Sequence, residues 1–351
     1  MKKYYTRACN FYYGEISKKL VKKRITLPLS GNNSISFDKL EVYQRDKNKI
    51  SSKIIKLKEI KFQNNLLKKK INQDLRKIIS KKYYFNDVSL MGILNMTPDS
   101  FSDGGLFKNK KNAMKRIKQM IKAGAKIIDI GGESTRPGSL TVNSSKEWKR
   151  ISSVIKQFKK KFPKVLLSVD TRKSLVMKNA IKYKADIIND VSGFEFDSFS
   201  INTVSKKDVW KIIHHMQGTP QTMQNNPKYV NVLLDIYDFF EKKLRYLTKY
   251  SNQKKKFILD PGIGFGKNLK HNLILINNIS LFHSLGFPIL IGTSRKRFIN
   301  QISGEYDTDE RIGGTLSSII YLLSQGVQIF RVHNVEEVKQ GLLVYKKILG
   351  I

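Results

Sequence analysis

Residues 126–138 read KIIDIGGESTRPG, a short apolar run that leads directly into a polar loop rich in Gly and Ser. The same pattern recurs from residue 89 onward, with amphipathic helical segments between the apolar runs. A strand made of continuous Ile, Val and Leu is buried on both faces, as in parallel sheets that are covered by helices. The pattern therefore predicts an α/β fold built from repeated strand–helix units.

Eight apolar runs fit strands of this kind. We predict them at 88–94, 126–130, 165–169, 186–189, 209–214, 257–259, 289–292 and 327–331. Helical periodicity falls between them, most clearly at 112–123, 146–160, 231–250, 311–324 and 335–348. Eight such units match the roughly 250 residues of a (β/α)8 barrel, or TIM barrel. A doubly wound open sheet is the alternative, because periodicity alone does not close a barrel.

Residues 1–88 lack the regular strand–helix alternation that begins at residue 89. They predict an N-terminal appendage of small α/β or helical structure. A turn is indicated at 27–33 and a short alternating strand at 35–37. An amphipathic helix near 63–80 is indicated by four apolar residues at helical spacing, namely Leu67, Ile71, Leu75 and Ile78. We therefore divide the chain into a basic N-terminal extension of unknown role, residues 1–88, and a catalytic barrel domain, residues 89–351.

The charge of the chain is strongly positive. Its 351 residues carry a formal net charge of +38, of which residues 1–88 contribute +16. A basic excess can indicate a nucleic-acid partner or an anionic substrate. Because the lysines are scattered over the whole chain, we interpret most of them as solvated surface and expect no nucleic-acid partner. Binding of RNA or membrane lipid by the basic front segment stays an alternative, which the salt dependence of binding would reveal.

The composition also limits the cellular setting. Hydrophobic residues make up 40% of the chain, enough for a buried core. No apolar run approaches the roughly 18 residues that span a bilayer, and residues 1–7 lead into no apolar signal segment. The single cysteine, Cys9, forms no disulfide within the chain and no cysteine-rich metal site. We expect a cytoplasmic protein without a membrane contact.

In a barrel of this kind, functional groups collect where the strands end. One group of strand-end residues suits a flat, hydrogen-bonding heterocycle: Asp170, Asn189, Asp260 and Lys296. A second group resembles an anion site, since Arg matches phosphate oxygens: Asn95, Arg136, Arg331 and His333. The sequence thus predicts a pyrophosphate bound beside a planar heterocycle. It contains no P-loop and no nucleophile-elbow pattern.

Several strings of the sequence closely resemble dihydropteroate synthases of the bacterial folate pathway. The most specific is MGILNMTPDSFSDGG at residues 91–105, and further matches follow in the family's order at 131–138, 260–267 and 294–296. The likeness runs from about Leu90 to about Leu343. It implies a (β/α)8 barrel and a transferase that joins 4-aminobenzoate to 7,8-dihydropterin-6-ylmethyl diphosphate. Pyrophosphate and 7,8-dihydropteroate would be the products of an SN1-like displacement that uses Mg²⁺. The resemblance also implies a homodimer.

The resemblance carries roles over to individual positions. It implies that the pterin is held by Asp170, Asn189, Asp260 and Lys296. It implies that Asn95 meets the metal ion and the diphosphate, with the phosphates surrounded by Arg136, Arg331 and His333. The 4-aminobenzoate pocket, which sulfonamides occupy in this family, would be framed by Thr135, Arg136, Pro137, Phe101 and Ser294. As catalytic residues we predict Asp129, Arg136, Asp260 and Lys296.

Two other functions are compatible with parts of the pattern. A methyltetrahydrofolate:corrinoid methyltransferase is also a pterin-binding barrel, but it would not need a diphosphate group such as Arg136, Arg331 and His333. A catalytically silent paralogue that acts as a partner subunit would keep the binding motifs without turnover. The pair His214–His215 suggests a metal site at first sight. Adjacent residues on a strand point to opposite faces, however, so we expect no shared metal ion there.

Overall fold

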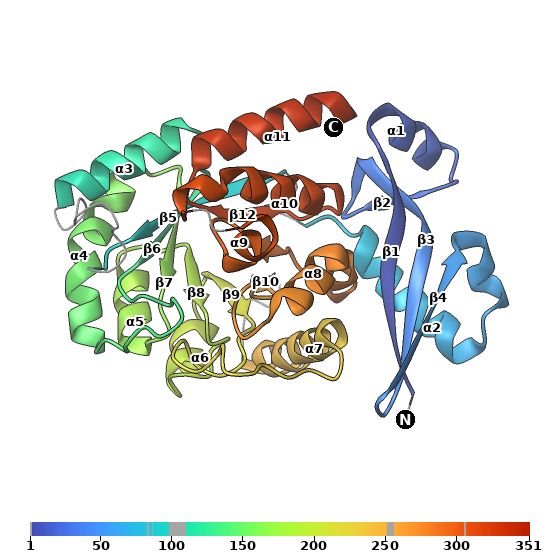
Figure 1. The fold of residues 1–351 in the computed structure, drawn as a ribbon, viewed down its shortest axis with the longest axis horizontal. Coiled ribbons are helices and arrows are strands. Elements are labelled where there is room, and N and C mark those ends of the chain that lie inside the picture. Colours follow the sequence, from blue (N-terminus) through green and yellow to red (C-terminus); the bar gives the residue numbers. More distant parts are fainter. Residues whose placement is uncertain (1, 83, 86, 98–109, 251–255, 305–306) are drawn as a thin grey trace.

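The computed structural model describes residues 2–351 apart from 83, 86, 98–109, 251–255 and 305–306. Its larger part is a sheet of eight parallel strands surrounded by helices (Figure 1). The strands are β5 (Ser89–Asn95), β6 (Ile127–Gly131), β7 (Leu166–Asp170), β8 (Ile187–Asp190), β9 (Trp210–His214), β10 (Phe257–Asp260), β11 (Leu290–Ile291) and β12 (Ile329–Val332). Each lies within about two residues of a predicted strand.

The sheet closes almost completely into a barrel. Its order is β10-β9-β8-β7-β6-β5-β12-β11, and every neighbouring pair in the register is parallel. The two ends meet through an isolated parallel bridge between Leu259 and Ile289, where the amide of Leu259 donates to the carbonyl of Pro288 at 2.9 Å. The prediction of a (β/α)8 barrel is confirmed, and the open-sheet alternative is wrong.

The helices that cover the barrel are amphipathic, as their sequences predict. They are α3 (Lys110–Lys122), α4 (Ser144–Lys161), α5 (Ser174–Lys182), α6 (Ser200–Ser205), α7 (Val232–Tyr250), α8 (Leu269–Asn277), α9 (Arg297–Ser303), α10 (Ile312–Ser324) and α11 (Val335–Leu349), with 3-10 turns η3 (Ile279–Leu285) and η4 (Asp309–Arg311). Helix α4 illustrates how the local sequence forms such a helix. The side chain of Asn143 caps the amide of Lys146, and Ile151, Val154 and Phe158 face the core.

Among the residues that the structure describes, apolar side chains fill the barrel interior near the ends where the strands begin. A buried inner cluster contains Phe85, Met91, Ile127, Ile187, Trp210, Ile212, Ile258, Leu290 and Ile329. Phe85 precedes β5, and its ring packs edge-on against Trp210, the first residue of β9, with ring centroids 5.1 Å apart. This aromatic pair closes the end of the barrel where the strands begin.

The N-terminal unit, which we define as residues 3–79, is an antiparallel sheet with two helices. It consists of β1 (Lys3–Tyr13), α1 (Gly14–Lys22), β2 (Leu27–Leu29), β3 (Asn32–Asp46), β4 (Lys49–Lys56), η1 (Leu57–Phe62) and α2 (Asn65–Ile79). Strand β3 pairs with β1, β2 and β4. The predicted helix near 63–80 is confirmed as α2, whereas the strand expected at 35–37 is only part of the first half of the much longer β3.

The N-terminal unit has its own small core and also packs on the barrel. Its core residues include Phe37, Leu40 and Ile71, whereas Tyr5 and Tyr43 belong to the core of the barrel layer. Figure 1 shows the unit at one side of the barrel, beside α8 and α10. Within the described parts of the chain, no helix is both long and apolar enough to cross a membrane.

Candidate active site

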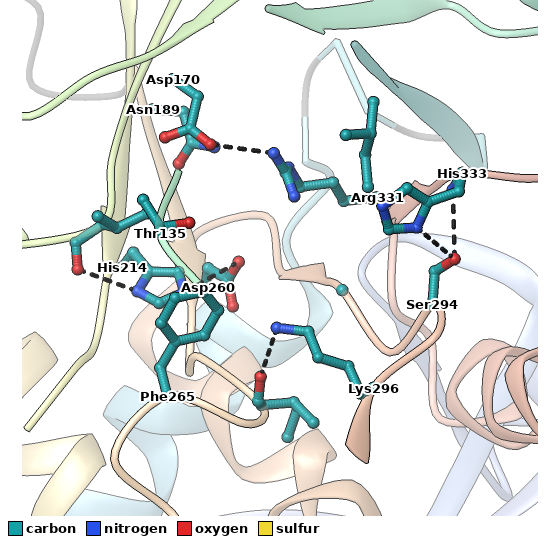
Figure 2. Close-up of a pocket in the computed structure, with 14 residues that line it drawn as sticks. Thr135, Asp170, Asn189, His214, Asp260, Phe265, Ser294, Lys296, Arg331 and His333 are labelled. Atoms are coloured by element: carbon teal, nitrogen blue, oxygen red, sulfur yellow. Dashed lines mark hydrogen bonds and ion pairs between the residues drawn. The ribbon is translucent and has the colours of Figure 1, made fainter. Parts of the chain in front are cut away.

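A cavity opens at the carboxyl ends of the barrel strands, where the sequence predicts the chemistry. Nearly every strand or the loop behind it contributes a side chain (Figure 2). The lining residues are Ile93, Thr135, Asp170, Asn189, Val191, His214, Asp260, Ile263, Phe265, Gly292, Ser294, Lys296, Arg331 and His333. Asp170, His214 and Asp260 are each the last residue of their strands, and all three line the cavity.

At the centre of the site, one guanidinium joins two carboxylates. The Nε of Arg331 lies 2.7 Å from Oδ2 of Asp129, and its Nη2 lies 3.0 Å from Oδ2 of Asp170. Asp129 is fully buried and also accepts hydrogen bonds from Ser168 Oγ at 2.6 Å and from Asn189 Nδ2 at 3.2 Å. The network fixes both Arg331 and Asn189 in orientation.

Asp129 and Asp170 share the single positive charge of Arg331, so these buried groups have an excess of negative charge when both carboxyls are ionised. Burial and the neighbouring Asp129 raise the pKa of Asp170 to about 8. Burial works in the opposite direction on Arg331, but the carboxylates of Asp129 and Asp170 raise the pKa of its guanidinium. The Asp170 carboxyl therefore holds a proton more readily than an ordinary aspartate, whereas Arg331 is a permanent cation.

An unpartnered acceptor lies beside this network. The Oδ1 of Asn189 is buried and has no hydrogen-bond partner among the described residues. Leaving a buried polar atom without a partner costs about 1–3 kcal/mol, so a ligand that donates to this atom gains by pairing it. Asn189 lines the cavity next to Asp170 (Figure 2). The arrangement can therefore accept an N–H group of a ligand.

Asp260 and Lys296 form the other polar side of the cavity. Oδ1 of Asp260 accepts from the amide of Gly262 at 2.8 Å, and burial raises the pKa of Asp260 to about 6. Nζ of Lys296 donates to the carbonyl of Ile263 at 2.9 Å and lies 4.1 Å from the centre of the Phe265 ring. Burial lowers the pKa of Lys296 to about 7. A carboxylate and an amine thus face the same space, beside an aromatic wall.

His214 is a neutral side chain of the same wall. Its Nδ1 lies 3.1 Å from the carbonyl of Val191, which makes Nδ1 the protonated nitrogen of the ring. Burial and the nearby Lys267 lower the pKa of His214 well below its usual range. Its ring packs edge-on against Phe265, with centroids 4.6 Å apart. His214 therefore helps to shape the cavity and presents an Nε2 acceptor.

Next to Arg331 lies a pair of hydrogen-bonding side chains. Oγ of Ser294 lies 3.0 Å from Nδ1 of His333 and accepts from the backbone amide of His333 at 3.2 Å. Burial and the neighbouring arginines Arg295 and Arg331 lower the pKa of His333 well below its usual range. Arg331 is thus the charged member of this group, and His333 and Ser294 are its neutral hydrogen-bonding members.

Comparison with known proteins agrees with this geometry. A family model described as a pterin-binding enzyme matches residues 91–333. The dihydropteroate synthase of Escherichia coli K12 is 39% identical over 261 residues, which cover 74% of this chain and 92% of the relative. The chain belongs to the dihydropteroate synthase family. It is therefore a transferase of folate biosynthesis and a member of a sulfonamide-target family.

Two solved dihydropteroate synthases share the fold. The enzyme of Yersinia pestis, solved with a sulfonamide drug, superposes with a TM-score of 0.72 at 37% identity and covers 75% of this chain and 95% of its own. The enzyme of Xanthomonas albilineans, solved with 4-aminobenzoic acid, gives a TM-score of 0.71 at 31% identity and covers 76% and 95%. Roughly the last three quarters of this chain are thus shared with the relatives, and the N-terminal unit lies outside that match.

The structure gathers most of the predicted dihydropteroate synthase residues around the cavity. Its lining includes Thr135, Asp170, Asn189, Asp260, Ser294, Lys296, Arg331 and His333. Asp129 lies behind Arg331 and does not line the cavity. Arg136 and Pro137 are exposed on the loop after β6 and are not part of the lining either, and Phe101 lies outside the described residues. The roles of these residues stay predictions.

Some lining residues had no role in the sequence-based prediction. Val191, Ile263 and Phe265 form apolar parts of the wall, and the signal that could have found them is their position one to five residues after a strand end. His214 ends β9 and faces the cavity. His215 faces away from it, with its Nδ1 3.1 Å from Nζ of Lys267. The two histidines thus point to different environments, and the described residues contain no group of three His, Cys, Asp or Glu side chains that could hold a metal ion.

A buried ionic cluster anchors the loop that follows β6. Oε2 of Glu133 accepts from Nε of Arg172 at 2.9 Å, and Oε1 accepts from Nζ of Lys173 at 2.8 Å and from the amide of Val142 at 2.9 Å. Lys173 also pairs with Glu147 at 2.6 Å. Because Thr135 lies on this loop, the cluster sets the position of one edge of the active site.

Proposed function

We propose that this chain condenses 4-aminobenzoate with 7,8-dihydropterin-6-ylmethyl diphosphate in the cavity described above. The observation that carries the proposal is the side-by-side placement of two kinds of group. Hydrogen-bonding side chains suited to a flat heterocycle, such as Asn189 and Asp260, share one small cavity with Arg331, which suits an anion (Figure 2). The substrate combines these two chemical parts in a single molecule.

The pterin ring would be held by Asp170, Asn189, Asp260 and Lys296. The free Oδ1 of Asn189 and the carboxylate of Asp260 accept from ring N–H and amino groups, while Lys296 donates to a ring oxygen or nitrogen. Because burial raises the pKa of Asp170, its carboxyl can take up a proton and then donate as well as accept. Phe265 supplies an apolar wall for the flat ring.

The diphosphate would be bound by Arg331 together with Ser294 and His333, and by Arg136 from the exposed loop. Arg331 uses one side of its guanidinium for Asp129 and Asp170, and a guanidinium has five N–H donors in all. Its remaining donors are therefore available to phosphate oxygens. Held by two carboxylates, the cation does not need to reorganise when charge develops on the leaving group.

The residues also fit a magnesium ion that is held jointly with the substrate. Asn95 ends β5, and its Oδ1 and the Cβ of Asp170 each lie 3.5 Å from the point where a Cβ on Gly131 would stand. Mg²⁺ often keeps several waters and takes one or two protein oxygens plus substrate phosphates. A single amide oxygen from Asn95 suits that pattern. When bound, Mg²⁺ would neutralise charge that develops on the leaving diphosphate.

The chemistry then follows an SN1-like order. The bond between the pterin methylene carbon and the diphosphate oxygen breaks, and its electron pair leaves with the diphosphate. The pterin ring stabilises the cation that remains, aided by the negative field of Asp129 and by Asp260 where it is ionised. The neutral amino group of 4-aminobenzoate attacks the cation and then loses a proton, so no strong base is needed beforehand.

The second substrate would lie against Thr135, Ser294 and the exposed part of the loop after β6. Thr135 and Ser294 both line the cavity, and Arg136 and Pro137 follow Thr135 directly. Support comes from the solved relatives that carry 4-aminobenzoic acid or a sulfonamide drug. A sulfonamide should accordingly compete with 4-aminobenzoate in this chain.

The proposal can be tested by measuring dihydropteroate formation from both substrates and Mg²⁺. Asp260→Asn and Lys296→Met should each lower kcat/KM by about 10- to 100-fold, as expected for a lost hydrogen bond to a charged group. The matched control Glu195→Gln removes a largely exposed carboxylate and should leave the rate unchanged. Full activity in both cavity variants, or no product with folded wild-type protein, would overturn the proposal.

We also propose that the chain works as a homodimer through the outer faces of α10 and α11. Tyr321, Leu343, Val344 and Ile348 are exposed there, with 44%, 54%, 56% and 74% of their surface accessible. Large apolar side chains gathered on one face commonly mark a protein interface. The double variant Val344→Glu/Ile348→Glu should be monomeric by light scattering, whereas Ile16→Glu on α1 should not change the mass. A monomeric wild-type chain would contradict the proposal.

A further inference from the structure

A single carboxylate connects the N-terminal unit to a loop of the barrel. Asp235 lies in the first turn of α7, and its Oδ1 accepts from Nη2 of Arg45 in β3 at 2.6 Å. Its Oδ2 accepts from the backbone amides of Val230 and Asn231 at 2.9 and 3.1 Å. Asp235 therefore has one oxygen on the N-terminal unit and the other on the loop that runs from β9 to α7.

Arg45 forms the ion pair with the first turn of α7, at Asp235. Its neighbour across the sheet is Lys3, and both cations face the acidic side of α7. Lys3 binds farther along the helix, at Asp238 and Glu241, with distances of 2.6 and 2.8 Å. Arg45 binds Asp238 as well, at 3.2 Å, so its guanidinium bridges successive turns of α7. Lys3 thus forms ion pairs with the body of the helix, and Arg45 forms an ion pair with its first turn.

The loop from β9 to α7 in turn holds the loop that follows β10. Tyr229, directly before Val230, donates from its hydroxyl to the carbonyl of Gly266 at 2.7 Å. Gln224 donates from Nε2 to the carbonyl of Gly264, also at 2.7 Å. The two loops are tightly packed, because a Cβ on Gly266 would lie only 2.7 Å from the carbonyl oxygen of Gln217.

The loop after β10 is itself a wall of the active site. Ile263 and Phe265 line the cavity, and the carbonyl of Ile263 accepts the hydrogen bond from Lys296. A continuous set of hydrogen bonds and packed backbone therefore leads from Arg45, through Asp235 and Tyr229, to this wall.

We propose that Arg45 is a positioning residue for the pterin side of the active site. It acts through Asp235, which fixes the start of α7 and, with it, the loop from β9. The inference rests on the proposed function only for the identity of the ligand. The body of α7 is anchored independently by buried Ile236, Phe240 and Leu244. Loss of Arg45 should therefore loosen the two loops without displacing the helix.

The test compares Arg45→Met with Arg7→Met. Arg7 is the matched control, because its side chain is about as buried as that of Arg45. Arg7 forms its ion pair within the N-terminal unit, with Glu41 at 2.7 Å. Hydrogen exchange should become faster in residues 215–231 and 261–267 of Arg45→Met and stay unchanged there in Arg7→Met. This readout needs no substrate, so it remains decisive even if the proposed reaction fails.

The kinetic readout separates positioning from general stability. In Arg45→Met, the KM for the pterin diphosphate should rise about three- to tenfold, the usual range for residues that couple to a site from a distance. The KM for 4-aminobenzoate should stay within about twofold, because that substrate lies on the other side of the cavity. Arg45→Lys keeps one ion pair and should recover part of the loss.

A double variant tests whether Arg45 acts through Asp235. If Arg45 acts through Asp235, then adding Arg45→Met to Asp235→Asn should produce little further change in exchange or in pterin KM. The inference is overturned if Arg45→Met and Arg7→Met show the same loop exchange, or if the effects of Arg45→Met and Asp235→Asn simply add.

Discussion

Replacing Glu133 with Gln should destabilise the chain much more than the loss of a surface ion pair. The Glu133 side chain is 3% exposed, and it neutralises Arg172 and Lys173, whose side chains are 4% and 8% exposed. Removing one member of a buried ion pair costs about 3–5 kcal/mol, because a charge is left uncompensated. Lys173 keeps Glu147, and Arg172 lies over the ring of Phe196 at 3.9 Å. We therefore expect the lower end, about 3 kcal/mol.

The assay is equilibrium unfolding in urea, with Glu195→Gln as the control. Glu195 pairs with Lys243 at 2.8 Å but is 64% exposed, so its loss should cost no more than about 1 kcal/mol. The KM for 4-aminobenzoate should also rise in Glu133→Gln, since the loop with Thr135 loses its ion pairs with Arg172 and Lys173. Equal destabilisation of the two variants would show that the buried ion pairs of Glu133 contribute no more than a surface pair.

The same variant makes a prediction about pH. Burial opposes ionisation of Glu133, but hydrogen bonds from Arg172 and Lys173 lower the pKa of its carboxyl below the ordinary value. A carboxyl of this kind contributes stability above its unfolded pKa and loses it as the pH falls through its folded pKa. The difference between wild type and Glu133→Gln should thus shrink below about pH 4. A difference that stays constant down to about pH 3 would contradict this assignment.

Two further predictions concern the cavity and the closed end of the barrel. The kcat/KM for the pterin diphosphate should rise with pH through about 6 as Asp260 ionises and fall above about 7 as Lys296 loses its proton. Lys296→Arg should move the alkaline limb upward, and a profile without that limb in the wild type would argue against Lys296. Phe85→Ala should cost about 3–5 kcal/mol in thermal or urea unfolding, because the ring is buried against Trp210. A loss below about 1 kcal/mol would show that Phe85 does not close the barrel.

The sequence predicts the barrel well because two separate signals indicate each strand. Each strand is an apolar run, and a polar residue such as Asp170, Asn189 or Asp260 stands at its end. Strand β11 is the weakest case, with two residues in the structure against four predicted, since it joins β10 only through one bridge. The cavity could be predicted as a set of strand ends because parallel strands all finish on the same side of a barrel.

Other features depend on contacts between distant residues and leave no local signal. Arg172 and Lys173 look like ordinary loop cations in the sequence, yet they are buried around Glu133. Arg45 and Asp235 lie 190 positions apart, and neither belongs to a motif. The full length of β3 does not follow from one alternating pattern, because Asp38 and Lys39 separate Ile35 and Phe37 from Leu40 and Val42, which alternate in the opposite phase. Pairing with β1 and β4 carries the strand through this change of phase.

The most direct test is the rate of dihydropteroate formation by Arg331→Lys. Lysine keeps the positive charge, but it does not bridge Asp129 and Asp170 and does not bind a phosphate through two parallel N–H donors. We expect the rate to fall by about 10²- to 10³-fold, the range found when a preorganised donor to developing charge is lost. Arg7→Lys should keep the wild-type rate, and both variants should melt as folded proteins. An Arg331→Lys enzyme with the wild-type rate would contradict the claim that this cavity carries out the reaction.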